Sequence, residues 1–267
     1  MDLTIITWKD RAAHQLVWAL AGLALVLAGC ASGRQADFDV DAQIDYCHRK
    51  VLASIWELGD DYTRHARSIP EGETAWQTYP NTTDDWCSGF WAGILWYDYG
   101  LTGDTTVLRA ARGWTEALHD YAYHPLYDHD LGLIMTTSYL NGYRFMTERG
   151  GRRTADMATA DRYRTVLLAA ADSLCSLFNP KVGTLLSWPR HVVDYKGHNT
   201  VISTMANLEL LLWASRHGGS DTLYHIAVSH ADTTMHYHFR PDGSSYHVAV
   251  YDTLTGRHLY NCTHQGA

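Results

Sequence analysis

Positive charge is scarce in this sequence. Its 267 residues include 21 Lys and Arg against 29 Asp and Glu, which gives a net charge of −8. Nucleic-acid-binding proteins need a basic face to neutralise phosphates, so this balance argues against that class. Charged residues make up 19% of the chain and apolar residues 46%, which excludes a disordered chain. The length suits one folded domain or two.

The sequence also lacks the usual signatures of metal and cofactor sites. The spacing of Cys47, Cys87, Cys175 and Cys262 matches no zinc pattern. There is no glycine-rich phosphate loop and no Gly-x-Ser-x-Gly nucleophile elbow. We therefore predict no metal and no cofactor, and we interpret the four cysteines as small buried residues. Disulfides would be the alternative in an exported protein.

Phenylalanine is rare, with five residues, whereas tryptophan and tyrosine are frequent, with 10 and 17. Trp and Tyr combine a flat apolar face with a polar tip. Sugar rings present a similar mixture, so the skew fits a carbohydrate site. An aromatic-rich helical core would give the same composition, and composition alone leaves both interpretations open.

The first 29 residues have the features of a secretory signal. Lys9 and Arg11 precede an apolar run over residues 16–27, which is short for a membrane span. The run ends in the sequence LAGC at Cys30, which resembles a bacterial lipobox. The resemblance implies cleavage before Cys30 and lipidation of its thiol. We expect a lipoprotein that is anchored in a bacterial membrane and faces the periplasm; a plain anchor helix is the alternative.

Buried and amphipathic helical segments alternate in the rest of the chain. Their apolar spacing predicts helices over 38–67, 87–99, 104–118, 131–146, 163–177, 200–215 and 221–237. An all-α toroid with an inner and an outer ring of helices would produce this alternation, and a helical-repeat solenoid is the competing architecture. A long loop is expected over 179–199, and a short β-hairpin over 245–262.

Acidic residues stand just before two of the buried helices. Asp85 and Trp86 precede the helix at Cys87, and His129 and Asp130 precede the next buried helix. Inner helices of a toroid run the same way, so both carboxyl groups should open on one rim. Paired carboxylates in an aromatic cavity are typical of acid–base chemistry on sugars. Helix capping is the structural alternative, and a metal site would need further ligands that the sequence does not supply.

Several stretches, in order along the chain, resemble the unsaturated glucuronyl hydrolases, glycoside hydrolase family 88. They are residues 85–93, 129–132, 204–211, 240–248 and 263–266. The resemblance implies an (α/α)6 toroid over residues 30–267. It also implies hydrolysis of 4,5-unsaturated uronic acids from the non-reducing ends of oligosaccharides left by lyases. In this reaction the vinyl ether double bond is hydrated and the resulting hemiketal falls apart.

The resemblance also assigns roles to residues. Asp130 is the general acid and base, which protonates carbon 4 and then accepts a proton from the attacking water. Asp85 is the second catalytic carboxylate and holds the sugar hydroxyls, while Trp86 stacks on the ring. Further substrate-binding candidates are His129, His191, Arg240 and Gln265. The expected partner is the unsaturated oligosaccharide, with no nucleic acid, a membrane contact only through the lipid anchor, and a monomeric protein.

The sequence departs from the family pattern at two places. Ser203 stands where an acidic residue is expected, and the family segment that should follow Gly266 is not in the sequence. We therefore expect a chain truncated at its C-terminus, with several of the twelve helices lacking. An unsaturated rhamnogalacturonyl hydrolase is one alternative function. A non-catalytic glycan-binding lipoprotein, or an inactive fragment, is another.

Overall fold

The structure is a computed structural model that describes residues 38–82, 85–123, 128–147 and 156–264. The predicted signal segment, the lipidation site Cys30 and the candidate Gln265 lie outside these residues. The chain divides into two compact units, residues 1–46 and 47–267. The described part of the first unit is the start of the first helix. In the described part of the chain, no helix is long and apolar enough to cross a membrane.

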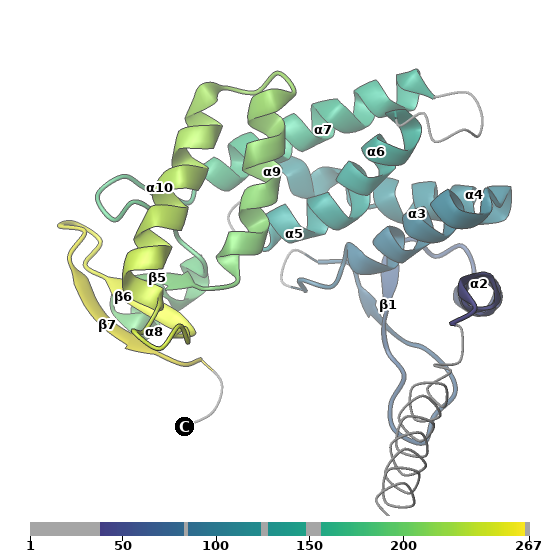
Figure 1. Cartoon of the computed structure of the whole chain (residues 1–267), viewed down its shortest axis with the longest axis horizontal. Helices are drawn as coiled ribbons and strands as arrows, with labels where there is room; N and C mark the ends of the chain where they lie inside the picture. The colour runs from purple at the N-terminus through teal and green to yellow at the C-terminus, as the bar shows by residue number, and fades with distance from the viewer. Residues whose placement is uncertain (1–37, 83–84, 124–127, 148–155, 265–267) are drawn as a thin grey trace, which may run out of the picture. The chain divides into compact units, whose positions relative to one another are not determined.

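Helices dominate the second unit (Figure 1). They are α2 (Val40–Leu58), which begins in the first unit, α3 (Phe90–Thr102), α4 (Thr105–Glu116), α5 (Leu131–Met135), α6 (Asn141–Thr147), α7 (Met157–Cys175), α8 (Val192–Tyr195), α9 (Thr204–Arg216) and α10 (Asp221–His238). A π-helical turn, η2 (Thr136–Leu140), joins α5 to α6, so that one helical segment runs over residues 131–147. Helices therefore occupy most of the segments that the sequence predicted to be helical.

Side-chain caps and apolar stripes explain where the outer helices form. Three of these helices begin at a side chain that accepts a backbone hydrogen bond. The acceptors are Asp104 for α4, Asp156 for α7 and Ser220 for α10, and the donors are the N–H groups of Thr106, Thr159 and Thr222. The stripe on α4 buries Val107, Ala110, Ala111 and Trp114. Outer helices therefore present one face to the inner layer, as their spacing predicted.

The helices pack as consecutive hairpins. Helix α3 packs against α4, α6 against α7, and α9 against α10, while α5 packs against α9 and η2 against α3. The helices α3, α5–α6 and α9 thus form an inner layer, and α4, α7 and α10 an outer one. Gly89 and Gly132 allow close approach: a Cβ on Gly132 would lie 2.7 Å from the Cβ of Asn207. This close approach brings the start of α5 against α9.

Three small antiparallel sheets accompany the helices. The first pairs β1 (Arg64–Ser68) with β2 (Gln77–Pro80), and the second pairs β3 (Phe178–Asn179) with β4 (Thr184–Leu185). The third has the order β5 (His198–Val201), β6 (Val248–Tyr251) and β7 (His258–Cys262). Strands β6 and β7 are the predicted hairpin, and β5 is an addition that the sequence did not reveal.

Several sequence predictions need correction. The first helix ends at Leu58, and β1 occupies part of the stretch predicted to be helical. The predicted loop over 179–199 holds β4, a 3-10 turn and α8, because short elements of this kind leave no periodic pattern. The four cysteines are free thiols; Cys47 is exposed and the other three are half-buried. The prediction of buried cysteines was therefore wrong for Cys47, and the other three are only partly buried.

Helix α3 is less buried than its apolar composition predicted. Trp91, Leu95 and Trp96 are buried, but Phe90, Ile94, Tyr97 and Leu101 are exposed. These four residues recur at helical spacing and form one stripe. Tyr97 contacts Phe145 of α6 at one point of the stripe, yet all four side chains remain exposed, so the largely apolar helix is buried mainly on one side.

A buried hydrogen bond between α3 and α4 provides a test of this packing. The indole N–H of Trp96 donates to the Thr115 hydroxyl at 2.8 Å, and both side chains are buried. Replacing Thr115→Val should lower the free energy of unfolding by about 1–3 kcal/mol, because the indole N–H loses its acceptor. The control Thr165→Val changes an exposed position on α7. Urea unfolding of both variants measures the difference, and equal stability would contradict this packing.

Candidate active site

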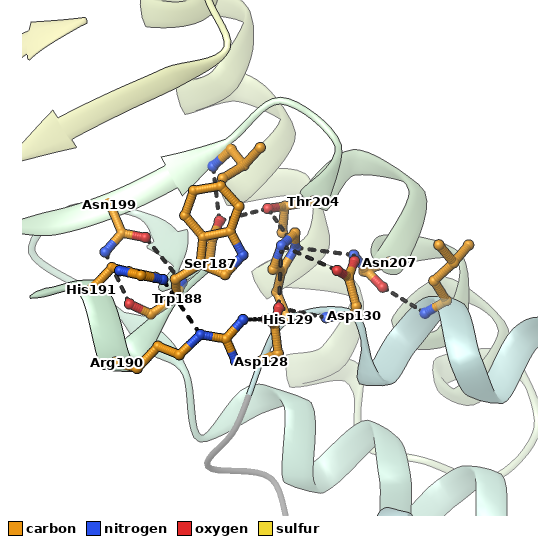
Figure 2. A network of polar contacts seen from close by, with 12 residues as sticks. Asp128, His129, Asp130, Ser187, Trp188, Arg190, His191, Asn199, Thr204 and Asn207 are labelled. Atoms are coloured by element: carbon orange, nitrogen blue, oxygen red, sulfur yellow. Dashed lines mark hydrogen bonds and ion pairs between the residues drawn. The ribbon is translucent and has the colours of Figure 1, made fainter. Parts of the chain in front are cut away.

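Asp130 lies at the entrance of the inner helix α5 (Figure 2). One carboxylate oxygen, Oδ1, accepts a hydrogen bond from Asn207 Nδ2 at 3.2 Å. The other oxygen, Oδ2, lies 3.7 Å from His129 Nε2, which is beyond hydrogen-bonding distance. The side chain is 17% exposed. Asp130 is thus held by a hydrogen bond at Oδ1, whereas His129 is too far from Oδ2 to form one.

The carboxamide of Asn207 fixes the arrangement around Asp130. Its Oδ1 accepts the backbone N–H of Leu133 at 2.5 Å, so the oxygen of the amide must face α5. The Nδ2 group therefore faces the site, where it donates to Asp130 and lies 3.1 Å from His129 Nδ1. A single side chain from α9 thereby connects the backbone of α5 with the carboxylate of Asp130 and the ring of His129.

His129 is a neutral ring with a defined tautomer. Its Nδ1 accepts from Asn207, and the Thr204 hydroxyl lies 3.0 Å from the same atom. The hydrogen is therefore on Nε2, which lies 3.3 Å from Asp128 Oδ1. Burial lowers the pKa of His129 to about 4. The ring is 1% exposed, so these contacts favour a positioning role for His129 over the substrate contact predicted from the sequence.

A chain of hydroxyl groups supports the ring from behind. The backbone N–H of Val201 donates to the Ser187 hydroxyl at 2.8 Å, and Ser187 lies 2.7 Å from the Thr204 hydroxyl. Because Asn207 makes Nδ1 of His129 an acceptor, the Thr204 hydroxyl donates to that atom, and Ser187 then donates to Thr204.

Asp128 is a buried carboxyl group that the sequence analysis did not select. It is 4% exposed, and its Oδ2 lies 3.3 Å from an Arg190 guanidinium nitrogen. Burial, and next the charge of Asp130, raise the pKa of Asp128 to about 7; the backbone N–H of Asp130 and then Arg190 act in the opposite direction. The dense Asp-His-Asp sequence was the only signal for this residue.

The same three residues could be taken for a metal site. The ligand atoms of Asp128, His129 and Asp130 lie within 4.8 Å of one another. However, His129 Nδ1 already accepts hydrogen bonds, so Nε2 carries the hydrogen and has no lone pair for a cation. The group is better suited to holding and moving protons than to binding a metal.

Asp85 is held by two basic side chains. Its Oδ2 lies 3.1 Å from Arg67 Nε and 3.2 Å from His65 Nε2, and its Oδ1 accepts the backbone N–H of Cys87. The sequence analysis treated Asp85 as free to hold sugar hydroxyls. The structure instead gives both of its oxygens partners within the protein. Arg67 and His65 come from β1, a strand that was predicted as helix, and for that reason they were missed.

The Cys87 thiol is influenced by both predicted carboxylates. Burial raises the pKa of the Cys87 thiol to about 11, and Asp85 and Asp130 both add to the rise, whereas Arg67 opposes it. Both carboxylates therefore act electrostatically on this half-buried thiol. That they open on the same rim stays a prediction.

Trp86 lies on the surface next to Asp85. Its ring is 47% exposed, with the Arg67 guanidinium 5.5 Å from its centroid and Phe90 in an edge contact. An exposed indole beside a carboxylate is the arrangement expected for a sugar-stacking platform. The ring is therefore half-exposed with the Arg67 guanidinium over it, and its stacking on a sugar stays a prediction.

Two of the predicted substrate-binding residues, Arg240 and His191, have their contacts away from Asp130. Arg240 donates to Ser244 and Ser245 within its own turn and lies 3.7 Å over the Tyr246 ring. His191 Nδ1 lies 2.8 Å from Asp194. Neither residue has a contact with Asp130 among the described residues. Arg190, one residue before His191, is the cation that reaches the site, through Asp128.

Aromatic rings lie on one side of this cluster. Trp188 is 6.1 Å from the His129 ring, and it also contacts Tyr195, His191, and His264. The backbone N–H of Trp188 donates to Asn199 on β5, which fixes the loop that carries Arg190. The third sheet therefore positions an aromatic wall and a guanidinium beside Asp128 and Asp130.

Comparisons with known proteins agree with this fold. No protein-family model matches the chain. An unsaturated glucuronyl hydrolase from Formosa agariphila is 34% identical over 184 residues, which are 68% of this chain and 42% of that protein. The solved structure of an unsaturated glucuronyl hydrolase specific for heparin matches with a TM-score of 0.66 at 33% identity, over 84% of this chain and 56% of that one.

A second solved structure is an Asp→Asn variant of an unsaturated glucuronyl hydrolase with the oligosaccharide dGlcA-Glc-Rha-Glc. It matches with a TM-score of 0.71 at 26% identity, over 84% of this chain and 56% of that one. The helical hairpins match the helical-toroid fold of these solved structures. Among proteins of this fold, the chain is a homologue of the unsaturated glucuronyl hydrolases. It spans about half the length of the relatives that it matches.

The coupling between the two carboxyl groups can be measured directly. Asp130→Asn should lower the pKa of Asp128 from about 7, because the charge of Asp130 is the second cause of the rise after burial. Carbon-13 NMR of the aspartate carboxyl groups across a pH titration gives this value. The control Asp161→Asn removes an exposed carboxylate on α7 and should leave Asp128 unchanged. An Asp128 titration that is the same in all three proteins would refute the coupling.

Proposed function

We propose that this chain carries the acid–base centre of an unsaturated uronyl hydrolase. The reaction is removal of a 4,5-unsaturated uronic acid from the non-reducing end of an oligosaccharide. The observation that carries the proposal is the position of Asp130 at the start of an inner helix, with one oxygen bound by Asn207 and the other open to approach. The sequence similarity to unsaturated glucuronyl hydrolases supports the same assignment.

The chemistry follows from one carboxyl group that acts twice. Asp130 gives its proton to carbon 4 of the vinyl ether, and positive charge develops at carbon 5 and the ring oxygen. The Asp130 carboxylate then accepts a proton from a water molecule while that water attacks carbon 5. The product is a hemiketal, which opens and releases the next sugar. Asp130 ends with the proton it started with, so no cofactor is needed in this scheme.

The neighbours of Asp130 keep its geometry constant through both steps. Asn207 donates to the carboxylate form at Oδ1, and the neutral ring of His129 separates Asp130 from Asp128. Asp128 takes Arg190 as its own partner. The guanidinium thus remains near the site without forming a direct ion pair to Asp130 in the described contacts. We assign Arg190, in place of Arg240 or His191, to the region of the substrate carboxylate.

The leading alternatives differ in the substrate or in the chemistry. An unsaturated rhamnogalacturonyl hydrolase would act on products from pectin. A glycan-binding lipoprotein would bind saturated and unsaturated oligosaccharides equally without turnover. One structural neighbour is described as specific for heparin, and this favours glycosaminoglycan products as the first substrates to try.

Turnover can be followed by the loss of ultraviolet absorbance from the conjugated double bond. The full chain should consume unsaturated disaccharides from heparin or chondroitin faster than those from pectin. Asp130→Asn should reduce the rate by about 10²- to 10⁴-fold, the usual contribution of a positioned proton-transfer group. Asp161→Asn serves as the control, with full activity expected.

Two results would decide against the proposal. Full activity of the Asp130→Asn variant would show that the mechanism is wrong. Equal binding of saturated and unsaturated disaccharides by calorimetry, without turnover by a folded chain, would establish the glycan-binding alternative.

The N-terminal sequence supports a location for this activity. We propose a bacterial lipoprotein, joined to a membrane through lipid on Cys30, in which the domain of residues 30–267 faces the periplasm as a monomer. The apolar run and the LAGC sequence support this proposal. The substrate would then be a short oligosaccharide that has already entered the periplasm.

Replacing Cys30, the proposed site of lipid attachment, tests the membrane anchor. In a bacterial host, the wild-type chain should sediment with membranes and incorporate labelled palmitate. Cys30→Ala should lose the label, because no thiol remains at the cleavage site. Cys47→Ala changes an exposed cysteine on α2 and should keep the label. Label on the Cys30→Ala protein would contradict lipidation at this residue.

A further inference from the structure

The third sheet has two faces of different chemistry. Val201, Val248 and Val250 form an apolar cluster with Trp188 on one face. The opposite face carries His198, Thr200 and Tyr251, since paired residues of antiparallel strands point the same way. This face packs against α10, which lies beside the sheet in Figure 1. A polar sheet face is therefore buried under a helix.

Helix α10 presents a matching polar row. His230, Thr234 and His238 are four residues apart, so they lie on one face of the helix. All three side chains are buried. His230 reaches β4 through the backbone of Leu185, and His238 reaches the carbonyl of Tyr246. The row thus faces the strands and not solvent.

Four polar atoms in this layer have no hydrogen-bond partner among the described residues. They are His230 Nε2, Thr234 Oγ1, His238 Nε2 and the Tyr251 hydroxyl. A buried polar atom without a partner is costly, and native proteins satisfy nearly all such atoms with protein groups or ordered water. Four in one interface between a helix and a sheet indicate a common ligand.

The two histidines need opposite partners. His230 Nδ1 accepts the backbone N–H of Leu185 at 3.0 Å, so its hydrogen is on Nε2, which is a donor. His238 Nδ1 lies 3.2 Å from the carbonyl oxygen of Tyr246, so the hydrogen is on Nδ1 and Nε2 is an acceptor. Burial lowers the pKa of His230 to about 3 and also lowers that of His238, so both rings are neutral at pH 7.

These tautomers select the chemistry of the ligand. A metal ion cannot bind His230 Nε2, because that atom carries a hydrogen. An anion would satisfy His230 but repel the lone pair of His238 Nε2. Water can accept from the first ring and donate to the second, and the Thr234 hydroxyl between them can do both.

Successive side chains of the row are separated by about 6 Å of helix rise. Two hydrogen bonds of about 2.8 Å that meet at one water oxygen near the tetrahedral angle join atoms about 4.6 Å apart. One water therefore bridges two neighbouring side chains of the row when their tips incline toward each other.

We infer that α10 and the β5–β6–β7 sheet enclose an ordered water file that runs from His230 through Thr234 to His238. Each water accepts a hydrogen bond from the His230 side and donates toward His238. The Tyr251 hydroxyl contributes from the sheet. The file stabilises the sheet against α10, and through β5 it supports the Asn199 and Ser187 contacts behind His129.

The ring tautomers test the inference in the wild-type chain. Long-range proton–nitrogen NMR should show hydrogen on Nε2 of His230 and on Nδ1 of His238 at pH 7. The His230 ring should remain neutral down to pH 5. Identical tautomers in the two rings, or a charged ring at pH 7, would remove the donor and acceptor polarity and overturn the file.

A crystal structure with ordered solvent tests the waters themselves. Density for one water between each pair of the three α10 residues is expected. A direct contact between these side chains, or a dry interface, would refute the proposal.

A matched pair of variants then tests the role of the middle hydroxyl. Thr234→Val should lose at least one of the two waters and lower the melting temperature. Thr233→Val changes the adjacent half-buried threonine and should keep both waters and melt as the wild type does. Both waters retained in a crystal structure of Thr234→Val would contradict the file, and the wild-type NMR result stands even if that variant does not fold.

Discussion

The arrangement at the entrance of α5 depends on the side-chain amide of Asn207. Its oxygen accepts the backbone N–H of Leu133, and its nitrogen lies within hydrogen-bonding distance of His129 and Asp130. The amide can do this because Gly132 has no side chain and lets the helices approach. Helix packing, the tautomer of His129 and the orientation of Asp130 are therefore consequences of one contact between α5 and α9.

Charge is distributed around this contact in a specific way. Asp85 is held by Arg67 and His65, whereas Asp128 shares Arg190 and keeps a raised pKa. The charge of Asp130 is the second cause of that rise, after burial. The neutral imidazole of His129 lies 3.3 Å from Asp128 and 3.7 Å from Asp130, and the Asn207 amide donates to Asp130.

Sequence reasoning predicted the helical parts well, for a physical reason. Amphipathic spacing and capping residues are local signals, and they identified α4, α7, α9 and α10. The short strands β1, β4 and β5 were missed, because two to five residues carry no readable period. Missing β1 meant missing Arg67 and His65, and missing β5 meant missing the support for Ser187. The motifs predicted that Asp85 and Asp130 stand just before inner helices, but not which side chains contact their carboxylates.

The sequence by itself determined the class of fold, the homology to unsaturated glucuronyl hydrolases and the choice of Asp130, since each is carried by residues close together in the chain. Only the tertiary structure decided that Asp128 is buried beside Arg190, that Arg240 is occupied in its own turn, and that α10 covers a polar sheet face. The contact of Asp128 with Arg190 joins residues 62 positions apart. The other two facts depend on side-chain contacts and on burial, which no local pattern encodes.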